Sequence, residues 1–335
     1  MTAPLASMRA AHTVKDMDEP RPATIHSLTR RRAQAFAGAG RPVKARPAHV
    51  HRKMDPDAAF RATLSDCLAQ MTANAGVVRA GRSVEGLHQL RVAMRRLDVA
   101  LKGFGEEFGQ PWLAELRSRA KVLASRLAPA RDLDVFTGEL LTAPAKAFGA
   151  ETFAGLRAAA EALRTAHWEQ AHATVAGADF ALFLDDLAAL AHSRLPLGRH
   201  GKLAATAARL LARQHARAKK RAVAARSQEE RDLHRLRIAL KGLRYTAEFF
   251  APLYDRGQVR RYLKEVKTLQ DSLGRLNDIA HAQAMVGTLA PAGAAAELRH
   301  AAGAVEGWYR ASRPRLVSQA LKRWDKFKAL PRFWE

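Results

Sequence analysis

The sequence predicts an all-α protein that contains the same basic helical unit twice, and three observations support this fold class. The first is composition, because Ala, Leu and Arg dominate a chain of 335 residues in which only 7% are aromatic, and these three are strong helix formers. The second is the apolar spacing, which is helical from residue 54 onward, without the alternation typical of strands. The third is an internal repeat.

The repeat relates two segments that lie 146 residues apart, residues 87–97 and residues 233–243. The same offset, without a gap, also relates four identical residues further along the chain. Lys121, Leu123, Leu127 and Asp132 correspond to Lys267, Leu269, Leu273 and Asp278. A match that persists in one register indicates tandem duplication of a helical bundle. We place the boundary near 196–201, so the first helical repeat covers 54–198 and the second 199–335.

The individual helices are expected between breaks that carry Gly, Pro, Asn or Asp. Within the first repeat the expected helices are 56–80, 83–104, 110–127, 131–141, 150–173 and 179–192. Within the second they are 200–226, 228–251, 256–273, 277–287, 294–310 and 313–327.

Residues 1–53 are expected to form a disordered basic tail, because they mix Pro, Gly and Arg without a sustained apolar period. Met54 is followed by Asp55-Pro56-Asp57, which is a helix-start signal. We therefore expect the folded part to begin there, and Met54 to be the true start of the native chain.

The charge of the chain points to an anionic partner. Lys and Arg number 56 against 32 acids, which gives a formal net charge of +24 and a pI of about 11.1. Such an excess repels itself in the compact state and is typical of proteins that bind nucleic acid, an anionic membrane surface or a phosphate polymer. A generally solvated basic surface is the alternative.

Other features of the sequence exclude several classes. Cys67 is the only cysteine, so an intramolecular disulfide and a Cys-based zinc cluster are excluded and a reducing cytoplasm is the expected compartment. A run of about 18 apolar residues is missing, which predicts no membrane-spanning helix and no membrane partner.

The repeated helix presents a row of cations beside an apolar stripe. At 100° per residue, positions i, i+3, i+7, i+10 and i+14 share one arc. That arc holds His88, Arg91, Arg95, Asp98 and Lys102 in the first copy, and His234, Arg237, Lys241, Arg244 and Glu248 in the second. The cations recur roughly every 5 to 10 Å along the axis, which suits a linear polymer of phosphates, and Arg grips phosphate oxygens in pairs.

Further cations are expected to extend this row. Lys121 and Lys267 occupy equivalent positions on the next helix, with Lys264 nearby, and a second face carries Arg209, Arg213 and Arg217 at spacing i, i+4, i+8. For the row on the two repeated helices, the alternative is a solvated face paired with acids on neighbouring helices. The shortage of acids in the chain favours the polyanion interpretation.

The repeated pattern resembles the CHAD family (conserved histidine α-helical domain). The matching segments are EGLHQLRVAMRRL at 85–97, ARDLDV at 130–135, LHRLRIALKGLRY at 233–245 and LQDSLGRLND at 269–278, and Trp324 and Phe333-Trp334 look like the family's ending. The resemblance spans residues 54–335. It implies two pseudo-symmetric four-helix bundles whose basic helices line a central channel that binds inorganic polyphosphate, in proteins associated with polyphosphate granules.

The family's basic positions carry over onto named residues of this chain. In the first repeat they are His88, Arg91, Arg95, Arg96 and Lys121, and in the second they are His234, Arg237, Lys241, Arg244 and Lys267. Three residues depart from the family pattern. Ala128 stands where glycine is usual, Asp98 interrupts the first row, and Gly242 replaces a frequent basic residue.

Catalytic and metal sites are not expected. The two histidines are flanked on their own faces by Arg or Lys, which repel a metal cation, so phosphate contact or a helix-packing hydrogen bond is the preferred role. Asp132 and Asp278 lie near expected helix starts, so capping or pairing with Arg131 is the preferred role. The chain also lacks a Gly-rich phosphate loop, a nucleophile elbow and the alternating Glu/Lys strand of triphosphate tunnel enzymes.

The sequence therefore predicts a stand-alone, non-enzymatic protein that binds inorganic polyphosphate, needs no cofactor and resides in the cytoplasm, at polyphosphate granules. The alternative is a basic helical protein that binds nucleic acid. That alternative is weaker because only Tyr245 in the two rows could stack on a base.

Overall fold

The computed structural model describes residues 40–194, 196–198 and 201–335, and all regular structure within them is helical, as predicted. In the first half the elements are α3 (Pro56–Ala80), α4 (Val84–Phe108), α5 (Trp112–Arg126), α6 (Ala128–Val135), the π-helical turn η1 (Phe136–Leu140), α7 (Thr142–Phe148), η2 (Glu151–Phe153), α8 (Ala154–Ala176) and α9 (Ala178–His192). In the second half they are α10 (Leu203–Ala224), η3 (Ala225–Ser227), α11 (Glu230–Phe250), η4 (Ala251–Leu253), α12 (Arg256–Leu289) and α13 (Ala296–Phe327). None of the helices so described is long and apolar enough to cross a membrane.

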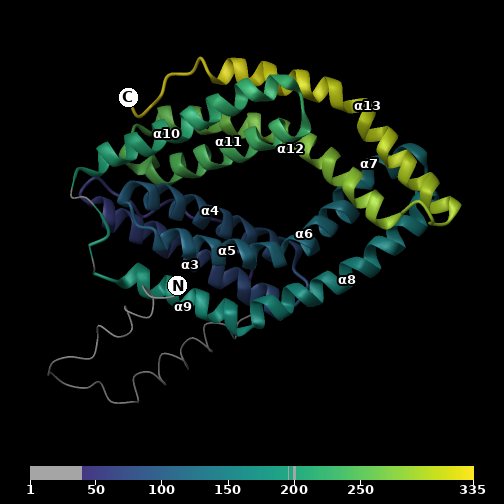
Figure 1. Ribbon diagram of the computed structural model, residues 1–335, viewed down its shortest axis with the longest axis horizontal. Helices are drawn as coiled ribbons and strands as arrows, with labels where there is room; N and C mark the ends of the chain where they lie inside the picture. Colours follow the sequence, from purple (N-terminus) through teal and green to yellow (C-terminus); the bar gives the residue numbers. More distant parts are fainter. Residues whose placement is uncertain (1–39, 195, 199–200) are drawn as a thin grey trace.

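The helices form two layers that meet at α4 and α11 (Figure 1). One layer holds α10 to α13, and the other holds α3, α4, α5 and α9. At one end the layers spread apart, and α8 and α13 come into contact there and close the far side. The two basic helices thus lie in the middle of the molecule and face each other across the junction.

The two basic helices begin at equivalent residues. The first residues of α4 and α11 are Val84 and Glu230, which are separated by the repeat offset of 146. The start of α4 is capped by Ser83, whose Oγ accepts a hydrogen bond of 3.1 Å from the backbone N–H of Gly86. In α3, Asp55 accepts from the N–H of Ala58 at 2.7 Å, so the helix start read from Asp55-Pro56 is confirmed.

Burial of the predicted apolar stripe orients each basic helix. Nine of its ten members are at most 2% exposed, and Leu233 is 5% exposed. The full set is Leu87, Leu90, Met94, Leu97 and Leu101 on α4, with Leu233, Leu236, Leu240, Leu243 and Ala247 on α11. Each buried Leu or Met contributes about 1.5 to 3 kcal/mol. Because both stripes belong to one hydrophobic cluster, the neighbouring cationic faces have fixed directions.

Four of the expected helices are in fact two long ones, so these boundaries were wrong. The expected helices 256–273 and 277–287 are the single helix α12, and 294–310 and 313–327 are the single helix α13. Leu273, Leu276 and Ile279 remain buried through the expected break in α12, so packing outweighs the weak helix propensity of Gly274 and Asn277. In α13, a proline inside the helix is likewise followed by buried apolar residues.

Residues 40–53 also correct the expected disordered tail, although residues 1–39 of that tail lie outside the described part of the chain. The backbone N–H and C=O of Val43 both bond to the side chain of Asn74, at 3.0 and 2.8 Å. Val50 is 3% exposed, and the Arg52 guanidinium donates to the carbonyl of Leu253 at 3.2 and 3.0 Å. Residues 40–53 form no helix, but hydrogen bonds and burial fix them against the helices. The apolar periodicity of a sequence does not reveal contacts of this kind.

Candidate functional site

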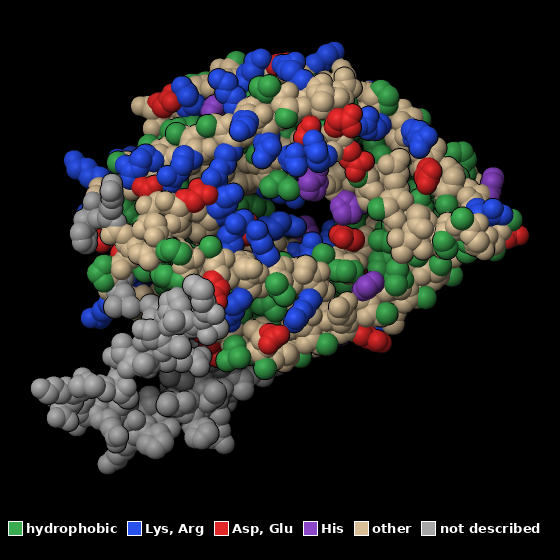
Figure 2. Space-filling view, in the orientation of Figure 1, with side chains coloured by type: hydrophobic (Ala, Val, Ile, Leu, Met, Phe, Trp, Pro, Cys, Tyr) green, Lys and Arg blue, Asp and Glu red, His purple; other side chains and the backbone are tan. Residues whose placement is uncertain are grey.

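A cavity of about 510 Å³ lies between α4 and α11, and we call it the central cavity. Figure 2 shows it as a hollow between the two layers, lined mostly by Lys and Arg with His and acidic side chains toward one end. Its charged and imidazole side chains are His88, Arg91, Arg95, Asp98, Arg131, Asp132, Glu139, His234, Arg237, Lys241, Asp278 and His281. Six residues of the predicted rows therefore line this cavity together: His88, Arg91, Arg95, His234, Arg237 and Lys241.

Three of these cations have no partner within the described part of the chain. Arg95, Arg237 and Lys241 form neither a hydrogen bond nor an ion pair there, and the Nε atom of Arg95 is buried. Arg91 donates from Nη1 to the carbonyl of Ala124 at 2.8 Å, which leaves its own buried Nε unpaired. Partly buried cations that form no ion pair raise the free energy of the fold, and Asp278 offsets only part of this for Arg237 and Lys241. Their convergence on one cavity is typical of a site that receives an anion.

Burial, followed by the crowding of like charges, lowers the pKa of these cations. Burial first, and then Arg237, Arg95 and the neighbouring guanidiniums, lower the pKa of Lys241 to about 6. Burial and then Arg95 lower the pKa of Arg91 to about 10, and burial also lowers the pKa of Arg237. Each shift means that the charged form is disfavoured in the empty cavity. A bound anion reverses that effect.

Two histidines at equivalent positions have different surroundings. The pKa of His88 is lowered by burial and then by Arg131 and Arg95. His234 is exposed, and its Nδ1 lies 2.9 Å from Oδ1 of Asn277. Asn277 occupies the position equivalent to Arg131, so the first half of the cavity has a cation where the second has an amide. In the described ranges, no three His, Cys, Asp or Glu side chains gather in a way that could hold a metal ion.

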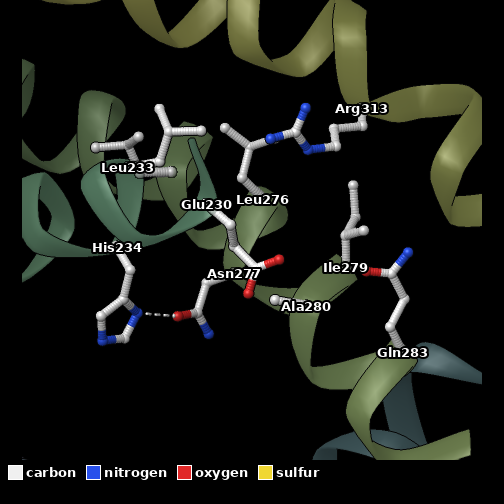
Figure 3. Close-up of a pocket in the computed structure, with 10 residues that line it drawn as sticks. Glu230, Leu233, His234, Leu276, Asn277, Ile279, Ala280, Gln283 and Arg313 are labelled. Carbon is white, nitrogen blue, oxygen red and sulfur yellow. Dashed lines mark hydrogen bonds between the residues drawn. The ribbon is translucent and has the colours of Figure 1, made fainter. Parts of the chain in front are cut away.

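A small pocket of about 40 Å³ adjoins the central cavity and shares His234 and Asn277 with it. Figure 3 shows the hydrogen bond between these two side chains, with Glu230 above them and Arg313 of α13 at the far side. The pocket is large enough for a water molecule or two. Its bond between His234 and Asn277 fixes the direction of the ring, which agrees with the helix-packing role weighed from the sequence.

Four carboxylates line the central cavity, those of Asp98, Asp132, Glu139 and Asp278, and two of them have cationic partners. Asp98, the residue that interrupts the first row, pairs with Arg117 at 2.7 and 3.3 Å. Glu139 lies 3.3 Å from Nη2 of Arg131. The sequence did not identify Arg131, Glu139 and His281 as lining residues. The only signal for them is their place beside the repeated Asp132 and Asp278.

The expected capping role of Asp132 and Asp278 was wrong. Asp132 lies within α6 and Asp278 within α12, and the cap of α6 has no side-chain hydrogen bond. Burial raises the pKa of Asp278, while Arg237 opposes that shift. Both carboxylates instead line the cavity beside the arginines of the row.

Arg96 was predicted to contact the ligand, but its side chain is only 5% exposed and points between α4 and α11. Its Nη1 lies 2.6 Å from Oε2 of Glu248, and its guanidinium lies 5.1 Å from the ring centroid of Phe249. Arg96 therefore joins the two halves and does not line the cavity. Its counterpart on α11 is Gly242, whose missing side chain leaves room for the side chain of Gln214. A Cβ at position 242 would lie 2.9 Å from Oε1 of Gln214.

Arg244 and Lys102 also lie outside the cavity lining. Arg244 turns toward Glu248, with Nε and Oε1 3.6 Å apart, and stacks on the Tyr245 ring at 4.9 Å. The cavity faces α11 on the side of Ile238 and Tyr245, so its centre is displaced round the helix from the predicted arc. Lys102 lies on the predicted arc of α4, but about one turn beyond Val99, the last residue of α4 that lines the cavity.

The face on α10 that was expected to extend the row is paired with acids. Arg209 and Arg213 contact Glu107 at 2.5 and 2.7 Å, and Arg217 contacts Glu106 at 2.7 Å. Both acids stand near the end of α4. These three residues therefore pair with acids of a neighbouring helix and do not extend the row into the cavity.

Three predicted lysines are exposed on the outer helices and do not line the central cavity. Lys121 lies on α5, and Lys264 and Lys267 lie on α12. The Nζ of Lys267 is 3.7 Å from Oδ2 of Asp271, a separation at which an exposed pair contributes little.

The fold and the cavity define an all-α protein with an internal basic site. The model of the CHAD domain matches residues 62–287, and the chain belongs to the CHAD family. The crystal structure of the CHAD domain from the plant Ricinus communis is 28% identical, with a TM-score of 0.78, and the match covers 87% of this chain and 98% of that one. PptA from Streptomyces chartreusis has the same fold at 19% identity and a TM-score of 0.65, over 82% and 99% of the two chains. None of the curated proteins matches significantly.

Proposed function

We propose that this protein binds inorganic polyphosphate in the central cavity. The observation that carries the proposal is the convergence of Arg95, Arg237 and Lys241 without partners in the described part of the chain. CHAD proteins are generally linked to polyphosphate, which supports this choice among anions. The cations of the cavity replace the counterions of the chain phosphates, so binding weakens as salt rises.

The geometry assigns different tasks to the cations. Arg91, Arg95 and Arg237 offer planar groups that each hold two phosphate oxygens, while Lys241 acts as a point charge. They lie on two helices that a shared core holds in place. The protein therefore loses little conformational freedom when the polymer binds. Association with polyphosphate granules follows if the same cavity engages long chains in the cell.

Nucleic acid is the weaker candidate for the same site. Tyr245 is 3% exposed, and the guanidiniums of Arg96 and Arg244 lie over its ring, at 5.8 and 4.9 Å. A ring covered in this way does not stack on a base, which single-strand binders generally require. Val99, Val135 and Ile238 supply the remaining apolar side chains of the lining, and none of them is aromatic.

The test is direct binding of sodium polyphosphate chains of graded length, followed by competition with RNA and DNA. The proposal predicts that long-chain polyphosphate displaces labelled nucleic acid and that an equal amount of phosphate in nucleic acid does not displace polyphosphate. Displacement in the opposite direction would assign the cavity to nucleic acid. We further propose that the protein is not an enzyme, and release of phosphate from polyphosphate with Mg²⁺ or Mn²⁺ would contradict that.

A further inference from the structure

Lys241 occupies the most strongly cationic position of the central cavity. It stands one turn after Arg237 on α11 and is partly buried. Four guanidiniums act on its amine, those of Arg91 and Arg95 from α4 and those of Arg237 and Arg244 from α11 itself. Asp278 of α12 opposes them, while Asp98, Asp132 and Glu139 also line the cavity. The neutral side chain of Gln214 from α10 lies next to Gly242.

The amine yields its proton more easily than its neighbours do. Arginine stays protonated because its pKa is far above neutrality, and even Arg91, lowered by burial and Arg95, has a pKa of about 10. The pKa of Lys241 falls to about 6 under burial and the same guanidiniums. At neutral pH the empty cavity therefore holds mostly a neutral amine at this position.

A bound polyanion changes the balance at this position. Phosphate oxygens placed between the guanidiniums and the amine favour the ammonium form. We infer that polyphosphate enters the central cavity together with one proton, which is taken up by the Nζ of Lys241. This inference rests on the proposed function. The proton comes from solvent or buffer, and the reaction gives a bound ammonium and no covalent change.

The linkage has a definite sign. Binding takes up protons, so affinity must fall as pH rises, by roughly tenfold per unit between the pKa of the empty site and that of the complex. Three histidines line the same cavity as Lys241. The variant Lys241→Arg, described next, separates proton uptake by the amine from uptake by these imidazoles.

The experiment is titration calorimetry of the full chain with long-chain sodium polyphosphate at pH 8.5, in two phosphate-free buffers of different ionisation enthalpy. The difference in apparent binding enthalpy gives the number of protons taken up. We expect about one proton for the native chain. The matched variants are Lys241→Arg, whose charge is permanent, and Lys322→Met, which removes an exposed lysine of α13.

We expect Lys241→Arg to bind polyphosphate without proton uptake, and Lys322→Met to bind with the uptake of the native chain. Binding by the native chain with no buffer dependence overturns the inference and leaves the proposed function standing. Uptake that persists in Lys241→Arg assigns the proton to another group and overturns it as well. No binding of polyphosphate in either buffer overturns the proposed function and this inference together.

Discussion

Replacing Lys241 with methionine should stabilise the empty protein, because the lysine is retained at a cost to the fold. Its pKa falls from 10.5 to about 6 in the folded state. Between these values the unfolded chain binds a proton that the folded chain does not. The stability of the native protein therefore falls as pH drops from 10.5 to 6, and below pH 6 it changes no further.

The size of the effect follows from the same two values. Each unit of pKa difference corresponds to about 1.36 kcal/mol, so at pH 7 the lysine costs a few kcal/mol, and at pH 9.5 about 1 kcal/mol. Methionine has nearly the same helix propensity as lysine and removes the charge. Lys241→Met should thus gain a few kcal/mol at pH 7 and much less at pH 9.5.

The assay is urea unfolding followed by circular dichroism at both pH values, without polyphosphate. The control is Lys322→Met, which should change the free energy of unfolding by less than about 0.5 kcal/mol, as exposed substitutions usually do. A Lys241→Met protein that is less stable than the native one at pH 7, or whose gain is the same at both pH values, would refute the reasoning.

Three further predictions separate structural cations from binding cations. Arg96→Ala should destabilise the protein by about 1.5 to 3 kcal/mol in urea unfolding, because the hydrogen bond between the halves is lost and Glu248 keeps only its contact with Arg244, and an unchanged midpoint would contradict the assignment. Arg95→Ala should leave stability unchanged or raised, and it should lower the slope of log affinity against log salt by roughly 0.7, as for one lost contact with a single-stranded polyanion; an unaltered slope would exclude Arg95 from the site. Ser83→Ala removes the cap on Gly86 and should cost about 1 kcal/mol, while Ser83→Gly should recover most of it.

The sequence predicts the parts of the site that lie on one helix. His88, Arg91 and Arg95 share an arc whatever the helix packs against, because spacing along a helix fixes direction around it. The buried stripe beside them shows which way the arc faces. The internal repeat then assigns the same role to the equivalent residues of the second half.

Contacts between distant segments could not be predicted in the same way. Arg209 and its partner Glu107 are 102 residues apart, and Arg96 and Glu248 are 152 residues apart. Each acid is an unremarkable member of a helix in the sequence, so periodicity gives no signal for the pairing. The difference between Arg209 and Arg95, one paired and one without a partner in the described ranges, is therefore a property of the fold alone.

The most direct test of the account compares two variants that each lose four basic side chains. One replaces Arg91, Arg95, Arg237 and Lys241 with Ala, inside the central cavity. The other replaces Arg209, Arg213, Arg217 and Lys264 with Ala, outside it. Both should keep their helicity by circular dichroism before binding is measured.

The measurement is filter binding of long-chain polyphosphate at one salt concentration. Hydrogen bonds to charged groups contribute about 1.5 to 3 kcal/mol each, and about 1.4 kcal/mol is tenfold in affinity. The cavity variant should therefore bind at least ~100-fold more weakly, while the outer variant should stay within about tenfold of the native chain. Equal losses in the two variants, or unchanged affinity in the cavity variant, would contradict the central cavity as the site.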